Sequence, residues 1–135
     1  MSLTLLSEGK TIRIKAHGYS MYPAIKPGSL ILIEPLREKG KPLPGEIVAI
    51  KRESGIVVHR VVKTVFRNST TWYITRGDSN AITDDPSTID KIVGRIVKSE
   101  PTGENPKPAD IRINTKPNYI LNRIRVIYIF IVKKI

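Results

Sequence analysis

The candidate nucleophile of this sequence is Ser20, which lies in the stretch HGYSMYPAIKPGS, residues 17–29. Two prolines and a glycine follow it, and a segment with so many turn-forming residues ordinarily does no more than reverse the chain. Here, however, the serine is flanked by tyrosine and methionine in place of the usual Asn or Asp. A serine hydroxyl becomes a nucleophile only when a neighbouring base removes its proton. Whether Ser20 is a turn residue or a nucleophile therefore depends on the base that the chain supplies.

The candidates for that base are the two histidines, His17 and His59. His17 is three residues from Ser20, a separation that rarely gives in-line geometry in a turn, so we expect a loop residue that lines the site. His59 lies in the apolar segment GIVVHRVV, where strand alternation puts it on one face and Arg60 on the other. A histidine on a half-buried face needs a hydrogen-bonding partner. Taken alone, His59 is more readily explained as a core histidine bonded to the backbone than as a base.

A loop with three carboxylates follows the expected strand TTWYIT. The stretch RGDSNAITDD, residues 76–85, contains Asp78, Asp84 and Asp85. Loop aspartates ordinarily bond to their own backbone, but a carboxylate also fixes the tautomer of an imidazole base and stabilises its charged form. The chain thus offers a serine in a stiff loop, a histidine on a strand and a carboxylate loop after the next strand. Their order and spacing indicate more than any one of them does alone.

Four segments in sequence order resemble the serine-peptidase superfamily of the signal peptidases and the SOS repressors. GYSMYPAIKPGS resembles the serine box, whose usual pattern is Ser-Met-x-Pro followed by Gly-Asp. LPGEIVAIK resembles the second Gly-Asp-x-Val element, IVVHRVV the box that holds the general base, and RGDSNAITD the Gly-Asp-Asn-x-x-x-x-Asp box. The resemblance extends over roughly residues 11–98. Any single box is weak evidence, whereas four boxes in the right order are strong evidence.

The resemblance implies that the nucleophile is Ser20, the general base His59 and the acid of the triad Asp84. Bacterial signal peptidases and the SOS repressors use lysine as the base, whereas the archaeal and endoplasmic-reticulum branch has histidine within the same Val-His-Arg-Val wording. Asp85 is the weaker candidate for the acid. Lys63, four residues after His59, is an unlikely substitute for the histidine as the base. The resemblance also implies three residues that shape the site without taking part in the reaction: Gly18, Met21 and Asp78.

The chain departs from the superfamily pattern at several positions. The pairs at 28–29 and 45–46 are Gly-Ser and Gly-Glu where the superfamily has Gly-Asp. Gly18 stands where signal peptidases generally carry a serine that helps the oxyanion hole, so we expect backbone N–H groups, including that of Ser20, to replace it. The N-terminus also lacks the long apolar run of a signal peptide or membrane anchor. We therefore expect a cytoplasmic or peripheral membrane protein.

Short segments rich in β-branched residues recur between turn signals, which predicts an all-β fold. By resemblance this is the coiled antiparallel sheet or partly open barrel of the signal peptidases and repressor proteases. No helical periodicity is evident over any ten-residue window up to residue 100. The expected strands are 11–16, 30–36, 45–52, 55–66, 70–77 and 91–100.

The organisation predicted for the chain is a peptidase-like β domain over 1–100, a linker or loop over 101–118 and a C-terminal segment over 119–135. The linker is predicted from the proline-rich stretch EPTGENPKPAD. The C-terminal segment YILNRIRVIYIFIVKKI is compatible with a strand, an amphipathic helix or a surface-binding tail. Its β-branched residues favour a strand that covers the barrel.

The charge and the residue types limit the partners. The chain has 23 basic and 12 acidic residues, a net charge of +11, which suits an anionic membrane surface, nucleic acid or simple solvation. Only 6% of the residues are aromatic and the basic residues are interspersed, so we expect no specific nucleic-acid partner. With no cysteine and only two histidines we expect no metal and no other cofactor.

Two functions from different classes remain open at this point. The first is a serine endopeptidase that cleaves a peptide or protein laid in extended form along a strand edge. The second is an inactive, non-catalytic binding module of the same fold, whose basic surface contacts anionic lipid or nucleic acid. Autoproteolysis, as in the repressors, is the weakest alternative, and the sequence predicts no oligomeric state.

Overall fold

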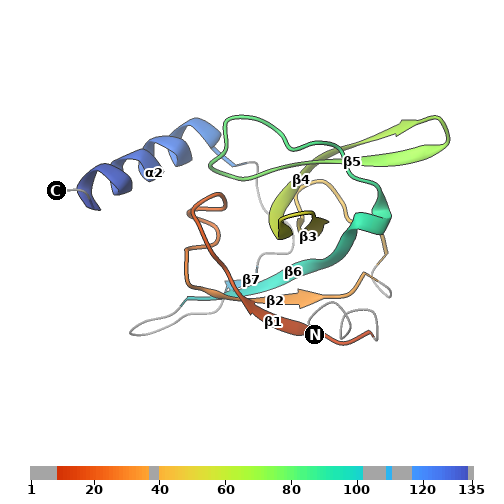
Figure 1. Cartoon of the computed structure of the whole chain (residues 1–135), viewed down its shortest axis with the longest axis horizontal. Coiled ribbons are helices and arrows are strands. Elements are labelled where there is room, and N and C mark those ends of the chain that lie inside the picture. Colours follow the sequence, from red (N-terminus) through yellow and green to blue (C-terminus); the bar gives the residue numbers. More distant parts are fainter. Residues whose placement is uncertain (1–8, 37–39, 102–108, 111–116, 134–135) are drawn as a thin grey trace.

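Strands make up most of the ordered elements of the protein (Figure 1). The computed structural model describes residues 9–36, 40–101, 109–110 and 117–133. The described elements are β1 (Ile12–Lys15), β2 (Leu30–Glu34), β3 (Ile47–Arg52), β4 (Gly55–Arg67), β5 (Thr70–Arg76), the 3₁₀ helix η1 (Ile89–Lys91), β6 (Ile92–Glu100), β7 (Ala109–Asp110) and the helix α2 (Tyr119–Lys133).

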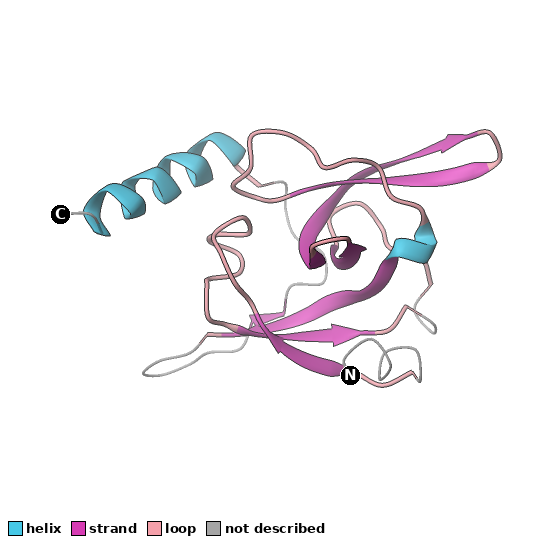
Figure 2. Ribbon diagram, in the orientation of Figure 1, coloured by secondary structure: helices cyan, strands magenta, loops and turns pink. Residues whose placement is uncertain are grey.

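A single antiparallel sheet contains all the described strands (Figure 2). Its hydrogen-bonded order is β1-β2-β6-β3-β4-β5, with β7 paired to β6 off this path. The sheet is not closed, since β1 pairs with β2 at one end of the order and β5 pairs with β4 at the other. The predicted all-β class with an antiparallel sheet is confirmed, and each of the six expected strands overlaps one of β1–β6.

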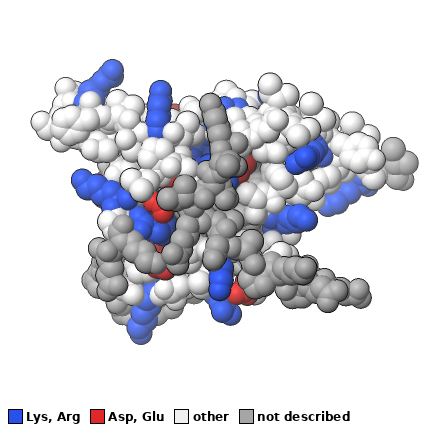
Figure 3. Space-filling view, turned by 180° about the vertical axis from the view of Figure 1, so that it is seen from behind, with Lys and Arg blue, Asp and Glu red and all other residues white. Residues whose placement is uncertain are grey.

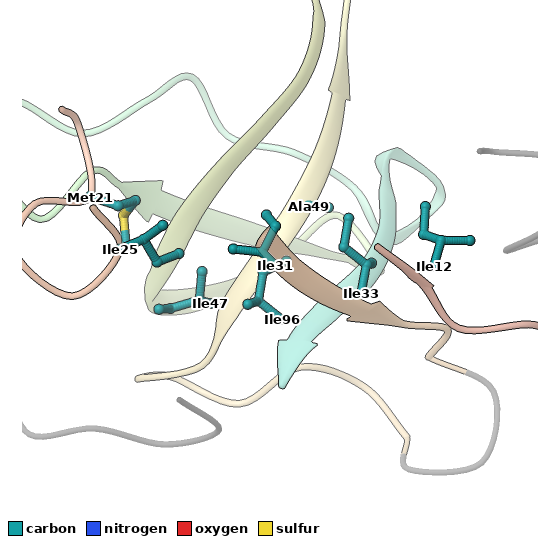
Figure 4. Close-up of a cluster of buried hydrophobic side chains, with 8 residues drawn as sticks. All are labelled: Ile12, Met21, Ile25, Ile31, Ile33, Ile47, Ala49 and Ile96. Carbon is teal, nitrogen blue, oxygen red and sulfur yellow. The ribbon is translucent and has the colours of Figure 1, made fainter. Parts of the chain in front are cut away.

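Strand β3 is buried on both of its faces from residue 47 to residue 50, which explains the apolar run IVAI at its start. Ile47 and Ala49 point into one apolar cluster, which Figure 4 shows together with residues of β1, β2 and β6. Val48 and Ile50 point into the other cluster, between β4, β5 and β6. All four side chains are 0% exposed. Each such burial stabilises the fold by about 1.5–3 kcal/mol for a Val or Ile, so β3 is the central support of the sheet.

Strand β4 is shared between two neighbours. From Gly55 to Arg60 it pairs with β3, and from Arg60 to Arg67 it pairs with β5. The turn to β5 is Asn68-Ser69, whose φ angles of 51° and 62° match a two-residue hairpin turn. Figure 1 shows this hairpin extending beyond the body of the molecule. The strand changes partner next to His59, so this part of β4 has one edge that no described strand covers.

The C-terminal segment forms the helix α2, so the prediction of a C-terminal strand is wrong. That prediction relied on β-branched residues, whose strand preference is weak without a sheet to pack against. The helix has a start signal that the prediction did not weigh, because Asn118 Oδ1 accepts a hydrogen bond from Leu121 N at 3.0 Å. Its less exposed residues recur at helical spacing and are Tyr119, Asn122, Val126 and Ile129.

Most of the predicted linker, 101–118, lies outside the described residues. Within it, Ala109–Asp110 form the short strand β7, which the sequence did not predict. Among the helices that the structure describes, none has the length and apolar character needed to cross a membrane.

Candidate active site

Ser20 lies in the loop that joins β1 to β2. Backbone hydrogen bonds close the neck of this loop, from Ala16 N to Ser29 O (2.8 Å) and from Gly28 N to Ala16 O (2.9 Å). Met21, the next residue in the chain, is 4% exposed and packs in the apolar cluster of Figure 4. Since Met21 is fixed in the core, the loop holds the serine beside it at a defined place above the sheet. This is the support that the predicted site-shaping role of Met21 requires.

The structure brings the three predicted side chains together. Ser20 Oγ lies 3.2 Å from Nε2 of His59, although the two residues are 39 positions apart in the sequence. Nδ1 of His59 lies 2.6 Å from Oδ2 of Asp84. With the imidazole proton on Nδ1, the ring donates to the carboxylate and leaves the lone pair of Nε2 facing the serine hydroxyl. The histidine is 6% exposed, and the contacts of its two ring nitrogens are to side chains, whereas the core-histidine alternative expected a bond to the backbone.

Asp84 is held in its charged form by its neighbours. Burial raises the pKa of its carboxyl, but hydrogen bonds from His59 and Thr75, together with the positive charge of Arg52, outweigh burial and lower the pKa below its ordinary value. Thr75 Oγ1 donates to Oδ2 of Asp84 at 2.7 Å, and the backbone N–H of Asp84 donates to Thr75 O at 2.8 Å. Two bonds to one residue of β5 therefore fix the carboxylate opposite the imidazole.

Asp78 takes a different place from Asp84. Its carboxylate accepts two hydrogen bonds from Arg60, Nε to Oδ1 at 2.9 Å and Nη2 to Oδ2 at 2.7 Å. Arg60 Nη1 also donates to Gly45 O at 2.8 Å, and the backbone N–H of Asp78 contacts Met21 Sδ at 3.5 Å. These contacts tie the carboxylate loop to the start of β3 and to the serine loop. Asp78 thus supports the loop without facing His59.

The serine loop and the carboxylate loop are joined directly. Ser79 N donates to Ser20 O at 2.9 Å, and Ser79 Oγ donates to Tyr22 O at 2.5 Å. Gly77 allows this approach, because a Cβ at that position would lie 2.8 Å from Ser20 O and 2.6 Å from Asn80 Nδ2. Sequence reasoning missed the roles of Ser79 and Gly77. A glycine directly after a strand was the one available signal of a close backbone approach.

A pocket with a volume of about 480 Å³ lies beside the serine and the histidine, and most of the side chains that line it are apolar. His17 and Gly18 line it, so the expectation that His17 is a lining residue is confirmed. Gly18 has a φ of 75°, a left-handed conformation that favours glycine. The apolar side chains of the pocket include Ile14, Ala16, Ile31, Ile56 and Val58.

The structure also bears on two other possibilities, Asp85 as the acid of the triad and a metal site. Asp85 is exposed, and its carbonyl oxygen accepts a hydrogen bond from Arg52 at 3.0 Å, so the contact to His59 is made by Asp84. In the part of the chain that the structure describes, no group of three or more His, Cys, Asp or Glu side chains could hold a metal ion.

A comparison with protein families matches residues 1–97 to the family described as Peptidase S24-like. The chain therefore belongs to the Peptidase S24-like family, and the predicted membership of this serine-peptidase superfamily is confirmed. The match contains Ser20, His59 and Asp84 and ends within β6, so the helix α2 lies outside it. A search of the curated proteins finds no match.

Proposed function

We propose that this protein is a serine endopeptidase in which Ser20 is the nucleophile, His59 the general base and Asp84 the acid that stabilises the base. The observation that carries the proposal is the chain of two hydrogen-bond contacts, 3.2 Å from Ser20 Oγ to Nε2 and 2.6 Å from Nδ1 to Asp84 Oδ2. Membership of the Peptidase S24-like family supports a peptidase-like fold. The contacts add the groups that acyl transfer needs at the distances it needs.

In the proposed mechanism, Nε2 of His59 takes the proton of Ser20 as Oγ bonds to the carbonyl carbon of the peptide. The imidazolium then gives this proton to the amine nitrogen as the C–N bond breaks, which leaves an acyl-enzyme. A water molecule is deprotonated by the same nitrogen and attacks the ester, and the serine regains its proton as the acid product leaves. Asp84, ionised throughout because its pKa is lowered, stabilises the positive charge on His59 at each stage.

The oxyanion of the tetrahedral intermediate needs hydrogen-bond donors. Gly18 offers no side chain, so we propose the backbone N–H of Ser20 as a donor. Two observations support a rigid position for it. The carbonyl of the same peptide unit, Tyr19 O, accepts a hydrogen bond from Tyr22 N at 3.0 Å, and the carbonyl of the next unit, Ser20 O, accepts one from Ser79 N at 2.9 Å. With the peptide units on both sides of Ser20 held in this way, the N–H is presented without reorganisation, which is the condition for strong oxyanion stabilisation.

The substrate proposed for this site is an extended peptide. The pocket lies between the β1 end, at residues 14–16, and residues 56–59 of β4. In the described pairings, β1 has β2 on one edge only, and residues 55–59 of β4 have β3 on one edge only. An extended chain between these edges would gain backbone hydrogen bonds, with alternate side chains directed into the apolar pocket. The pocket therefore favours a small or apolar side chain next to the cleaved bond.

The experiment is cleavage of a peptide library, with the new termini identified by mass spectrometry. We expect the wild-type protein to cut within extended apolar segments and the Ser20→Ala and His59→Ala variants to be inactive. Asp84→Asn should be slower than wild type by roughly 10⁴-fold. The matched control is Ser54→Ala, which changes an exposed serine of the β3–β4 turn and should cut at the wild-type rate.

Circular dichroism and thermal unfolding must show that each inactive variant is folded. Ser20→Ala removes one loop oxygen and should change the free energy of unfolding by no more than about 1 kcal/mol. Cleavage at the wild-type rate by folded Ser20→Ala would transfer the activity to other residues. A folded wild-type protein that cuts nothing in the library would favour the non-catalytic binding module of the same fold.

A further inference from the structure

The helix α2 is attached to the body by one narrow face. Asn122, 5% exposed, donates from Nδ2 to Asp78 O at 3.1 Å. At the first turn the guanidinium of Arg76 lies 3.6 Å from the centre of the Tyr119 ring. At the last turns the rings of Phe130 and Tyr19 are 5.1 Å apart, centre to centre. The contacts named here are polar and aromatic, and among the described residues neither of the two apolar core clusters includes a residue of α2.

The opposite face of α2 is apolar and exposed. At about 100° per residue, its side chains point away from the face that contains Asn122. Every one of them is at least 40% exposed, a reversal of the usual arrangement in which the apolar face of a helix meets the core. Their contiguous exposure along the whole helix is typical of an interaction surface. The side chains of this outward face are Ile120, Leu121, Ile124, Ile127, Tyr128, Ile131 and Val132.

Basic residues border the outward face. Arg123 lies on one side of it and Arg125 on the other, both exposed, and Lys133 ends the helix. The helix contains no Asp or Glu, in a protein with a net charge of +11. In Figure 3 the region of the helix is mostly white, the colour of uncharged residues, with a few blue Lys or Arg side chains along it. An apolar strip between arginines matches the boundary between the acyl chains and the anionic headgroups of a bilayer.

We propose that α2 binds an anionic lipid bilayer by lying in its surface, with the outward face among the acyl chains and Arg123 and Arg125 at the headgroups. The apolar side chains run from the first turn of the helix to the last, so the contact is made along the side of the helix. The charge complementarity selects a bilayer over a second copy of this chain, because two such helices would bring their arginines together. This proposal is independent of the peptidase activity.

The same attachment would hold the candidate active site one helix diameter, roughly 10 Å, from the lipid. Tyr19 precedes Ser20, and Asp78 belongs to the carboxylate loop, so α2 contacts both loops of the site. Lys133 Nζ also donates to the hydroxyl of Tyr19 at 2.6 Å. A protein bound through α2 would therefore hold these loops close to the bilayer surface.

The test uses the full-length protein and vesicles of phosphatidylcholine with or without phosphatidylglycerol. We expect cosedimentation with the anionic vesicles that weakens as salt is raised. The variant Ile120→Gln/Ile124→Gln/Ile131→Gln should lower the partition coefficient by about tenfold or more, because it removes three large apolar side chains from the contact. The matched control, Leu43→Gln/Phe66→Gln/Ile82→Gln, changes three exposed apolar residues outside α2 and should bind like wild type.

Fluorescence quenching separates insertion from adsorption, since Trp72 is the only tryptophan of the chain. In a Trp72→Phe background, Ile124→Trp should be quenched by brominated phospholipid, whereas Phe66→Trp at the β4–β5 hairpin should not. Equal quenching at both positions, or anionic-vesicle binding without quenching at 124, would overturn the proposal in favour of adsorption through the general basic surface. The proposal would also be overturned if the wild-type protein did not bind anionic vesicles at low salt. Self-association of the wild-type protein that is lost in the triple α2 variant would overturn it in favour of a second copy of the chain.

Discussion

The guanidinium of Arg60 donates two hydrogen bonds to the carboxylate of Asp78, at 2.9 and 2.7 Å, in a place where both side chains are almost fully buried. The residue before it, His59, contacts Asp84. Two consecutive residues of β4 therefore hold two of the three acids of one loop. Because neighbouring side chains of a strand point to opposite faces, the loop passes from one face of β4 to the other between Asp78 and Asp84. One pair is a buried ion pair, and the other belongs to the candidate active site.

Removing Arg60 should destabilise the protein strongly. Arg60→Met leaves the Asp78 carboxylate, 2% exposed, without its partner, and breaking a buried pair in this way costs about 3–5 kcal/mol. The measurement is the free energy of unfolding in urea. The control is Arg13→Met, which removes a surface pair with Glu100 at 3.6 Å and should cost about 1 kcal/mol or less. Equal losses in the two variants would contradict the structural role of Asp78.

The stability of the protein should depend on Asp84 in acid. Its pKa is lowered in the folded state, so the unfolded chain binds the proton first as the pH falls. The stabilisation by this group is complete above the ordinary aspartate pKa of about 3.9 and is lost as the pH falls from there through the folded pKa. The free energy of unfolding of Asp84→Asn should therefore fall less steeply with falling pH than that of wild type over this window. The measurement is the free energy of unfolding in urea as a function of pH. Parallel curves for the two proteins would contradict a lowered pKa of Asp84 in the folded state.

Gly77→Ala should displace the serine loop. The added Cβ would lie 2.8 Å from the carbonyl oxygen of Ser20, a backbone atom that can move only with its loop. We expect a loss of about 1–3 kcal/mol in the free energy of unfolding. The proposed cleavage should fall by about 10²-fold or more, because a misplacement of about 1 Å has that effect on positioned groups. Unchanged NMR shifts for the serine loop would show that the loop accommodates the methyl group and would contradict this prediction.

The strands and the order of the site segments could be predicted from the sequence because their signals are local. Alternation placed His59 and Arg60 on opposite faces, and their different partners agree with this. The boxes around Ser20 and Asp84 supplied the rest by resemblance. Each of these inferences needed only a few neighbouring residues and the direction of the chain.

The contacts that assemble the site could not be predicted in this way, since they join residues far apart in the sequence. Asp78 carried no local sign that its partner would be Arg60, 18 positions away, and Thr75 no sign that it would bond Asp84. The strand predicted at the C-terminus failed for a related reason. β-branched side chains select a strand only when a neighbouring strand accepts them, and the described part of the sheet ends without pairing to residues 119–133.

The attachment of α2 should depend on Asn122, the one buried residue of the helix. Asn122→Ala removes the donor to the carbonyl of Asp78, and an unpaired buried carbonyl costs about 1–3 kcal/mol, enough to release a helix with so few other contacts. Amide hydrogen exchange should show lost protection confined to α2, while β3 and β6 keep theirs. The control is Ile127→Ala on the outward face, 55% exposed, which should leave α2 protected. Protection of α2 that persists in Asn122→Ala would mean that the aromatic contacts of Tyr119 and Phe130 suffice to hold the helix.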